Sequence, residues 1–259
     1  MNKLFVGVFE GISREEQLNI AKEIGYDGFF TGPEFVCDHA ELRAFRAQGD
    51  ELGLSYETIH SSLKGCSDIW FEGKEGDDYI NVLLSEIDIC VTLDVPILIV
   101  HVQTDFRKDT NFELGAKRYE SVVAKAKENG IKIAFENADD EDYIYRMLDY
   151  FDEPHVGFCY DSGHESSVTR GAHFLPRLGK RLICTHLHDN DSTSDQHKLP
   201  FDGVIDFAQV VKDLKAIGYR GNLTFELRYS DEYANKYSKR EFLEECYTRA
   251  LKLRDMLNE

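Results

Sequence analysis

Apolar stretches alternate with amphipathic stretches eight times along the chain, and this alternation is the strongest constraint on its fold. The apolar stretches have the length of single strands, and the stretches between them carry apolar residues at helical spacing. The expected strands cover residues 4–8, 27–31, 54–60, 97–101, 132–136, 156–160, 182–188 and 223–226. The expected helices cover residues 14–24, 38–52, 77–93, 112–129, 141–150, 173–178, 206–217 and 238–257.

Strict alternation of strands and helices favours a parallel sheet. Eight such units in 259 residues predict a closed (β/α)₈ barrel, the TIM barrel of the α/β class, rather than an open sheet. Neither a linker nor a change in composition divides the chain, so residues 1–259 are expected to form a single domain.

The overall charge limits the partners of such a barrel. A formal net charge of −18 disfavours nucleic acid and anionic membrane surfaces as partners. The apolar runs are too short to span a membrane, and the first residues lack the apolar core of a signal peptide. The six cysteines are scattered, without a C-x-x-C motif, and are expected to be reduced. These features indicate a cytoplasmic protein, for which a homo-oligomer stays open.

Residues that can bind a metal or transfer a proton occur where six consecutive expected strands end. In a (β/α)₈ barrel the carboxyl ends of the strands meet at one rim, where active sites form. These residues are His60, His101, Glu136, Asp161, His164, His186, His188 and Glu226. One histidine or glutamate at a strand end is more often hydrogen-bonded or solvated than functional. Such residues on six neighbouring strands together predict a site.

A further pair follows the seventh expected strand. His186 and His188 are two residues apart, which places both imidazoles on one face of a strand. Asp195 and His197 are again two apart in the loop after them. Four such side chains close together in the sequence indicate metal binding or acid/base chemistry.

Glu136, Asp161, His186 and Glu226 form the tightest expected group, because they come from four adjacent strands. Three carboxylates held together without a cation would repel one another. One divalent metal ion removes this conflict. Three hard oxygen ligands and one nitrogen suit Mn²⁺, Mg²⁺ or Co²⁺, with Zn²⁺ less strongly indicated.

The motifs around these residues resemble the xylose isomerase-like TIM barrel superfamily, in particular its branch of sugar and sugar phosphate isomerases and epimerases. The resemblance covers the whole chain and is most specific in the segments 135–137, 161–164, 186–190, 195–197 and 225–226. It implies that Glu136, Asp161, His186 and Glu226 bind one divalent metal ion. It also implies that Glu136 and Glu226 are the catalytic acid/base pair and that His164 and His188 lie near the substrate.

Two alternatives within the same superfamily stay open. A dehydratase of the inosose or dehydroshikimate type would use the same chemistry. An apurinic-site endonuclease would bind three zinc ions with His60, His101, Glu136, Asp161, His164, His186, Asp195, His197 and Glu226. The net charge argues against the endonuclease, because DNA binding needs a basic track. Family members often have a Pro-Gly-Glu-Gly turn where this chain has residues 199–203, which leaves the shape of that loop open.

The expected activity is proton transfer on a small sugar or polyol through a metal-stabilised enediolate. The residues expected to contact the substrate are His60, His101, His164, His188, His197, Arg228 and Trp70. Arg228, two residues after Glu226, could hold a substrate oxygen or form a structural salt bridge. Trp70 lies in a long loop, residues 61–76, that could close over a sugar, contact another subunit or pack against the surface.

Overall fold

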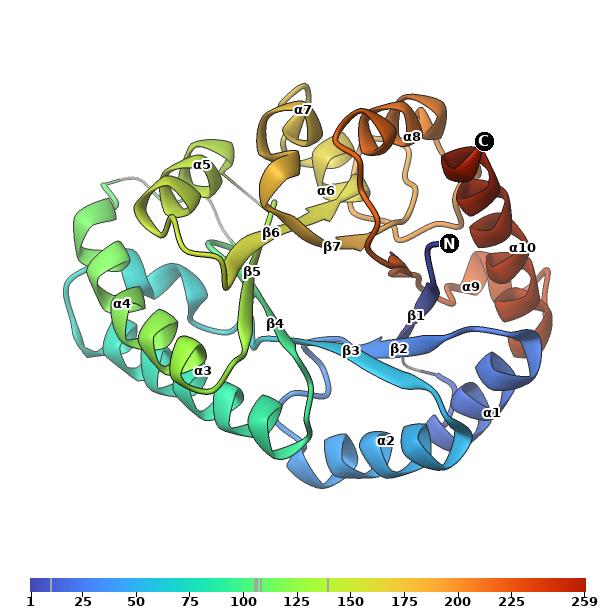
Figure 1. Cartoon of the computed structure of the whole chain (residues 1–259), viewed down its shortest axis with the longest axis horizontal. Helices are drawn as coiled ribbons and strands as arrows, with labels where there is room; N and C mark the ends of the chain where they lie inside the picture. Colours follow the sequence, from blue (N-terminus) through green and yellow to red (C-terminus); the bar gives the residue numbers. More distant parts are fainter. Residues whose placement is uncertain (10, 105–106, 108, 139) are drawn as a thin grey trace.

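The computed structural model describes residues 1–9, 11–104, 107, 109–138 and 140–259. Its strands form one parallel sheet in the order β7-β6-β5-β4-β3-β2-β1-β8, surrounded by helices (Figure 1). The strands are β1 (Leu4–Val8), β2 (Gly28–Thr31), β3 (Ser55–His60), β4 (Ile97–His101), β5 (Lys132–Glu136), β6 (Val156–Asp161), β7 (Leu182–His186) and β8 (Leu223–Phe225). The expected (β/α)₈ barrel is therefore confirmed.

The barrel closes between β7 and β8, just beyond the end of β7. Leu187 forms a parallel bridge with Phe225. The Leu187 N–H donates to the Thr224 carbonyl oxygen at 2.8 Å, and the Glu226 N–H donates to the Leu187 carbonyl oxygen at 3.3 Å. The expected strand 182–188 is thus regular only to His186, and Leu187 after it holds the two edges of the sheet together.

The helices form an outer ring around the strands (Figure 1). They are α1 (Arg14–Ile24), α2 (His39–Leu52), α3 (Lys74–Thr92), α4 (Phe112–Glu128), α5 (Glu141–Tyr150), α6 (Ser162–Ser167), α7 (Phe174–Leu178), α8 (Phe207–Ala216), α9 (Asp231–Ala234) and α10 (Lys239–Asn258), with 3₁₀ helices η1 (Cys66–Trp70) and η2 (Gly179–Arg181). The short helices α6, α9, η1 and η2 were not expected from the sequence. No helix in the described ranges is both long and apolar enough to cross a membrane.

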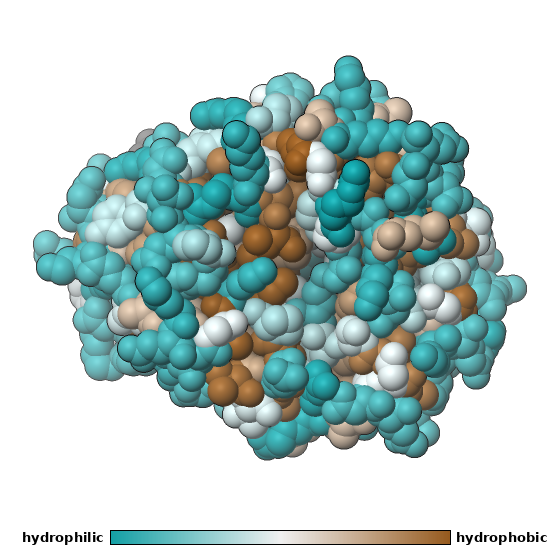
Figure 2. Space-filling model, in the orientation of Figure 1, coloured by the Kyte–Doolittle hydropathy of each residue, from teal (hydrophilic) through white to brown (hydrophobic). Residues whose placement is uncertain are grey.

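Side-chain hydrogen bonds fix where several of the helices begin, among them α1 and α8. The Ser13 hydroxyl accepts the Glu16 N–H at 3.2 Å, and the Asp206 carboxylate accepts the Gln209 N–H at 3.1 Å at the start of α8. Each bond satisfies an amide that has no partner within the helix. Hydrophilic side chains cover most of the face shown in Figure 2, with hydrophobic residues in small groups between them.

Two apolar regions hold the barrel together. The larger one fills the space between the strands and the helices. The smaller one lies inside the barrel and consists of Ile97, Ile99, Ala134, Cys159 and Cys184, with Ile183 packed against it. We call these five residues the barrel plug. The plug lies below the rim on the β4–β7 side of the interior, and the cavity described below opens at the carboxyl ends of the strands.

Trp70 belongs to the outer apolar region, and its expected role in a lid over the substrate is wrong. The side chain is fully buried, and its Nε1 donates to the Val102 carbonyl oxygen at 2.8 Å. Its ring stacks on Phe112 at a centroid distance of 5.9 Å and meets Tyr143 edge-on at 4.6 Å. Gly115 of α4 makes room for it, because a Cβ there would lie 2.0 Å from the indole.

Candidate active site

The strand register brings the expected site residues to one level of the rim. His101 of β4 is the register partner of Glu136 of β5, and Asp161 of β6 is the partner of His186 of β7. Residues paired in a sheet lie side by side, and these side chains all point into the barrel. Glu226 follows β8 directly.

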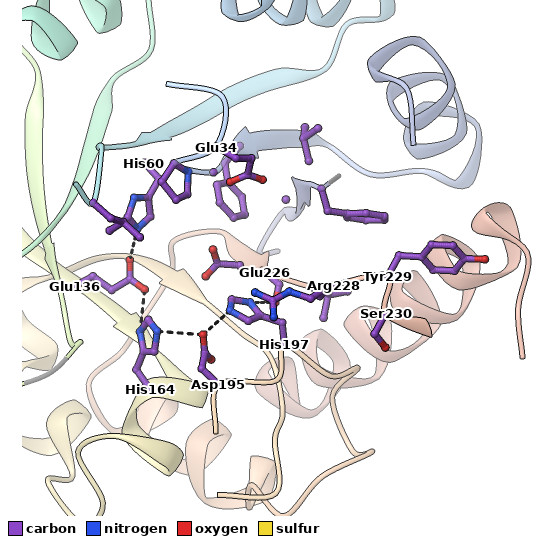
Figure 3. A pocket seen from close by; sticks show the side chains of 18 of the residues that line it. Glu34, His60, Glu136, His164, Asp195, His197, Glu226, Arg228, Tyr229 and Ser230 are labelled. Atoms are coloured by element: carbon purple, nitrogen blue, oxygen red, sulfur yellow. Dashed lines mark hydrogen bonds and ion pairs between the residues drawn. The ribbon is translucent and has the colours of Figure 1, made fainter. Parts of the chain in front are cut away.

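Glu136 is the centre of this arrangement and is fully buried. Its Oε2 lies 3.3 Å from His60 Nε2 and 3.5 Å from His101 Nε2. Its Oε1 lies 3.3 Å from both His164 Nδ1 and His186 Nδ1. One carboxylate thus faces four imidazoles that come from different strands or strand ends, and two of them, His60 and His164, are labelled beside Glu136 in Figure 3.

His186 joins the two glutamates. Its Nδ1 lies 3.3 Å from Glu136 Oε1 and 2.9 Å from Glu226 Oε2. Its ring stacks on Phe30 at a centroid distance of 4.5 Å, which fixes the plane of the imidazole. Two carboxylates therefore flank one point in the barrel mouth.

A second group lies beside the first and centres on Asp195. Asp195 Oδ2 lies 2.6 Å from His197 Nε2 and 3.6 Å from His164 Nε2, as Figure 3 shows. His188 stacks on His197 at 4.2 Å with ring planes 5° apart, and its Nε2 lies 3.1 Å from the Asp161 carboxylate. His164 links the groups, because its other ring nitrogen faces Glu136.

The backbone around Asp161 is held by neighbouring side chains. The Asn137 side chain donates to the Asp161 carbonyl oxygen and accepts the Asp161 N–H, both at 2.8 Å. The Ser162 hydroxyl donates to the His188 carbonyl oxygen at 2.7 Å and accepts the His188 N–H at 3.0 Å. Gly163 allows the close approach of His188, since a Cβ there would lie 1.9 Å from its ring.

Burial and the charges of neighbouring side chains shift the pKa values of Glu136, His186 and Glu226. Burial alone would raise the pKa of Glu136, but His186 and His101 outweigh it and hold this pKa well below its usual range. Burial likewise opposes the charged form of His186, yet Glu226 and Glu136 raise the pKa of His186 well above its ordinary value. The pKa of Glu226 is lowered because His186 outweighs its burial. The carboxylates are thus ionised, the form that binds a cation or accepts a proton.

The donor set fits a divalent cation. Ligand atoms of Glu136, Asp161, His186 and Glu226 all lie within 4.8 Å of one another, and those of His60, His101 and Glu136 form another such group. Several buried rim atoms have no hydrogen-bond partner among the described residues. They are Glu136 Oε2, His101 Nε2, His164 Nδ1, His186 Nε2, His188 Nδ1 and Asp195 Oδ1. A buried polar atom without a partner is costly, and a cation bound between His60, His101 and Glu136 would give Glu136 Oε2 and His101 Nε2 a partner.

A cavity of about 640 Å³ opens over these groups and is large enough for a small ligand. Among the residues that line it are His60, His101, Glu136, His164, Asp195, His197, Glu226, Arg228, Tyr229, Ser230, Asp231 and Glu34. Arg228 extends toward Glu226 and His197 (Figure 3). Its guanidinium has no hydrogen bond or ion pair with any residue in the described ranges, so the expected alternative of a structural salt bridge is not observed there.

Four polar residues that line the cavity were not expected from the sequence. Glu34 follows β2, Tyr229 and Ser230 follow β8, and Asp231 begins α9, so all four lie beyond the carboxyl end of a strand. Applying the rim rule to all eight loops, and not only to the last residue of each strand, would have indicated them. His188, in contrast, was expected to contact the substrate but does not line the cavity, because it is covered by His197.

Known proteins resemble this chain over almost its whole length. Residues 18–246 match the family model described as xylose isomerase-like TIM barrel. The protein y4fM of Sinorhizobium fredii, itself uncharacterised, is 29% identical over 96% of this chain and 90% of its own. The crystal structure of a D-tagatose 3-epimerase-like protein has a TM-score of 0.81 at 18% identity, covering 99% of this chain and 98% of its own. D-psicose 3-epimerase of Clostridium cellulolyticum H10 also has a TM-score of 0.81, at 13% identity over 98% and 99%.

Proposed function

The chain belongs to the xylose isomerase-like TIM barrel family, and from this membership and the rim geometry we propose that it is a sugar isomerase or epimerase that depends on a divalent metal ion. The observation that carries the proposal is the pair of carboxylates, Glu136 and Glu226, on the two sides of His186 Nδ1. Moving a proton at a carbon next to a carbonyl needs one group to remove it and one to return it. An ionised carboxylate removes the proton, and a second carboxylate that has taken up a proton from solvent returns one, so two carboxylates beside one cavity supply both groups.

The metal ion would be held by Glu136, Asp161, His186 and Glu226, whose ligand atoms lie within 4.8 Å of one another. When bound, a divalent ion supplies Lewis-acid polarisation of a substrate carbonyl and the adjacent hydroxyl. One of the two glutamates removes the proton next to the carbonyl, which gives an enediolate of the sugar. In an epimerisation the other glutamate, after taking up a proton from solvent, returns it to the opposite face of the sugar. In an isomerisation the first glutamate returns the proton that it removed to the adjacent carbon.

The remaining cavity residues bind and orient the sugar. His60, His101, His164 and His197 line the cavity, and the guanidinium of Arg228, which also lines it, offers donors to a substrate oxygen. The similar structures are those of a D-tagatose 3-epimerase-like protein and a D-psicose 3-epimerase, which supports a ketose as the substrate class. A cavity of about 640 Å³ also suits a molecule of that size.

A screen for proton exchange tests this proposal. Purified protein would be analysed for bound metal, loaded with Mn²⁺, Mg²⁺, Co²⁺ or Zn²⁺, and incubated with neutral and phosphorylated ketoses in deuterated water. We expect deuterium at the carbon next to the carbonyl of at least one ketose, and its loss after chelation. Absence of exchange with every metal and ketose would contradict the proposal, and loss of water from the product would instead support the dehydratase alternative.

The group formed by His60, His101 and Glu136 favours one second candidate, a hydrolase with more than one metal ion. Adjacent metal ions can bind both the attacking and the leaving oxygen of a phosphodiester. The formal net charge of −18 opposes a DNA substrate. Metal stoichiometry distinguishes the two, since three bound zinc ions together with cleavage of abasic DNA would favour the hydrolase.

A further inference from the structure

Asp189 is a buried carboxylate next to the active site, but it does not line the cavity. Its two oxygens accept four backbone N–H groups. Oδ1 accepts those of Asn190 at 2.8 Å and Ile205 at 3.1 Å. Oδ2 accepts those of Phe201 at 3.0 Å and Gly203 at 2.9 Å. A single side chain thus holds one side of the loop 198–205, and we call this loop the anchored loop.

The backbone of Asp189 holds the start of the same loop. Asp189 and Lys198 exchange both backbone hydrogen bonds, at 2.9 and 2.8 Å. Gly203 lets the far side of the loop come close, because a Cβ there would lie 2.2 Å from Asp189 Oδ1 and 2.1 Å from the Asn190 carbonyl oxygen. The anchored loop therefore wraps around the carboxylate at a distance that only glycine permits.

Two residues of this region adopt a backbone conformation that L-residues avoid. His197 has φ +49° and Phe201 has φ +74°. Such conformations persist only where surrounding contacts determine them, and they cluster at functional sites. For Phe201 the contact is its own N–H bond to Asp189. For His197 it is the pairing of the next residue, Lys198, with Asp189.

The conformation of His197 decides where its ring lies. The ring stacks on His188 and its Nε2 lies 2.6 Å from Asp195 Oδ2 at the cavity wall. The His197 carbonyl oxygen also accepts the Arg228 N–H at 3.1 Å. A change in backbone at this residue would therefore move Asp195, His197 and Arg228 together.

We propose that Asp189 is a positioning residue, which enforces the strained backbone of the anchored loop and so places the Asp195–His197 pair and Arg228 against the substrate. It acts through His197 and does not touch the substrate. The expected effect of Asp189 on kcat/KM rests on the proposed function, whereas its expected effect on the position of the His197 ring does not.

The test is Asp189→Asn, in which an amide NH₂ replaces one of the two acceptor oxygens. Asp202→Asn is the matched control. Asp202 lies in the same loop, but its carboxylate binds Arg249 and Tyr233 on the outer side and not Asp189. With the ketose identified by the exchange screen, we expect Asp189→Asn to lower kcat/KM about 10–100-fold, as removal of a supporting partner typically does. Asp202→Asn should change it less than about threefold, since it removes no contact to the rim.

The geometric readout is the NMR resonance of the His197 Hε1 proton, which the stacked ring of His188 shifts by its ring current. Asp189→Asn should remove this shift in a folded protein, and Asp202→Asn should keep it. Adding Phe201→Gly, which allows positive φ without strain, should restore part of both the shift and kcat/KM. An unchanged His197 resonance in Asp189→Asn, or an equal loss in both single variants, would overturn the proposal.

Hydrogen exchange of the wild-type protein tests the anchor even if Asp189→Asn does not fold. The Phe201, Gly203 and Ile205 amides should be as strongly protected as amides of the barrel strands, because all three are bonded to one buried carboxylate. Exchange at the rate of exposed loop amides would show that the anchor does not hold the loop and would overturn the proposal. Neither this result nor the His197 resonance depends on finding a substrate.

Discussion

The inward face of the same strands carries apolar residues at the lower end of the barrel interior and charged or metal-binding types of residue at the carboxyl end. On β4 the plug residues Ile97 and Ile99 point inward, and the next inward residue is His101. On β5 the sequence along this face is Ala134 and then Glu136. Two residues of a strand span only about 6.6 Å. The change from a dry apolar layer to a charged rim therefore depends on position along the strand, and the plug gives the rim a rigid base.

The largest expected effect is a loss of turnover that distinguishes the two glutamates at the rim from a third glutamate lower in the barrel. Glu136→Gln and Glu226→Gln should each lower turnover by about 10²–10⁴-fold, since each removes a proton-transferring group. The control is Glu57→Gln. Glu57 lies lower in the barrel, where Thr224 and Asn222 donate to its carboxylate, and burial raises its pKa.

We expect Glu57→Gln to leave turnover within about threefold of wild type, because this residue faces no part of the cavity. Steady-state rates on the identified ketose, with circular dichroism to confirm folding, make the comparison. Equal losses in the rim and lower variants would show that chemistry is not confined to the rim.

The next largest effect concerns Trp70, which connects the barrel to its outer helices. Trp70→Ala should lower the free energy of unfolding by about 3–5 kcal/mol, as truncation of a buried aromatic residue typically does. Its ring is packed between Phe112, Tyr143 and Gly115 and does not reach the cavity. Urea unfolding measures the loss, and KM for the ketose should stay unchanged. A raised KM with unchanged stability would restore the lid interpretation.

Much of this architecture could be predicted from the sequence because each strand and helix has its own hydrophobic period. Active-site residues of a barrel lie where strands end, and this rule was enough to predict that His101, Glu136 and Asp161 lie together at the rim. What the sequence could not indicate are contacts that depend on packing across the fold. The packing of Trp70 against Gly115 is one example, because it buries a side chain that was expected in a loop.

Asp189 is another contact of this kind. Its partners are backbone amides up to 16 residues away, and backbone amides carry no residue-type signal in a sequence. Its place directly after His188 made it part of a motif, yet its role becomes visible only when the loop is folded around it. Residues at strand ends can therefore be predicted from the sequence, whereas the residues that hold them in place, such as Asp189, can be recognised only in the folded structure.

A smaller effect, on the pH dependence of stability, is expected from Glu86, which holds the backbone just beyond the end of β3. Glu86 of α3 is buried and accepts the Ser62 N–H at 2.9 Å, two residues beyond His60. Burial raises the pKa of Glu86 from 4.5 to about 7, although the Ser62 bond opposes this shift. The folded state therefore binds the proton more tightly than the unfolded chain. Its contribution to stability is complete below pH 4.5 and is lost as the pH rises through 7.

Urea unfolding of wild type and Glu86→Gln across this pH range isolates the contribution. The wild-type unfolding free energy should fall relative to that of the variant by roughly 3 kcal/mol between about pH 4.5 and 8. The plug has no comparable titrating carboxyl, so Ile99→Val should show no such slope relative to wild type. A wild-type curve parallel to that of Glu86→Gln would contradict the raised pKa.

The smallest expected effect tests whether the plug acts on the rim at all. Ile99 is fully buried, and Ile99→Val removes one methylene group from the plug. The free energy of unfolding should fall by about 1 kcal/mol, which is typical of this substitution. Turnover should stay within about twofold of wild type, because Asn137 and Ser162 hold the rim backbone through their own hydrogen bonds. Turnover that instead falls in proportion to the lost stability in Ile99→Val and Ile99→Ala would contradict this expectation. It would show that the positions of the rim residues depend on the packing of the plug.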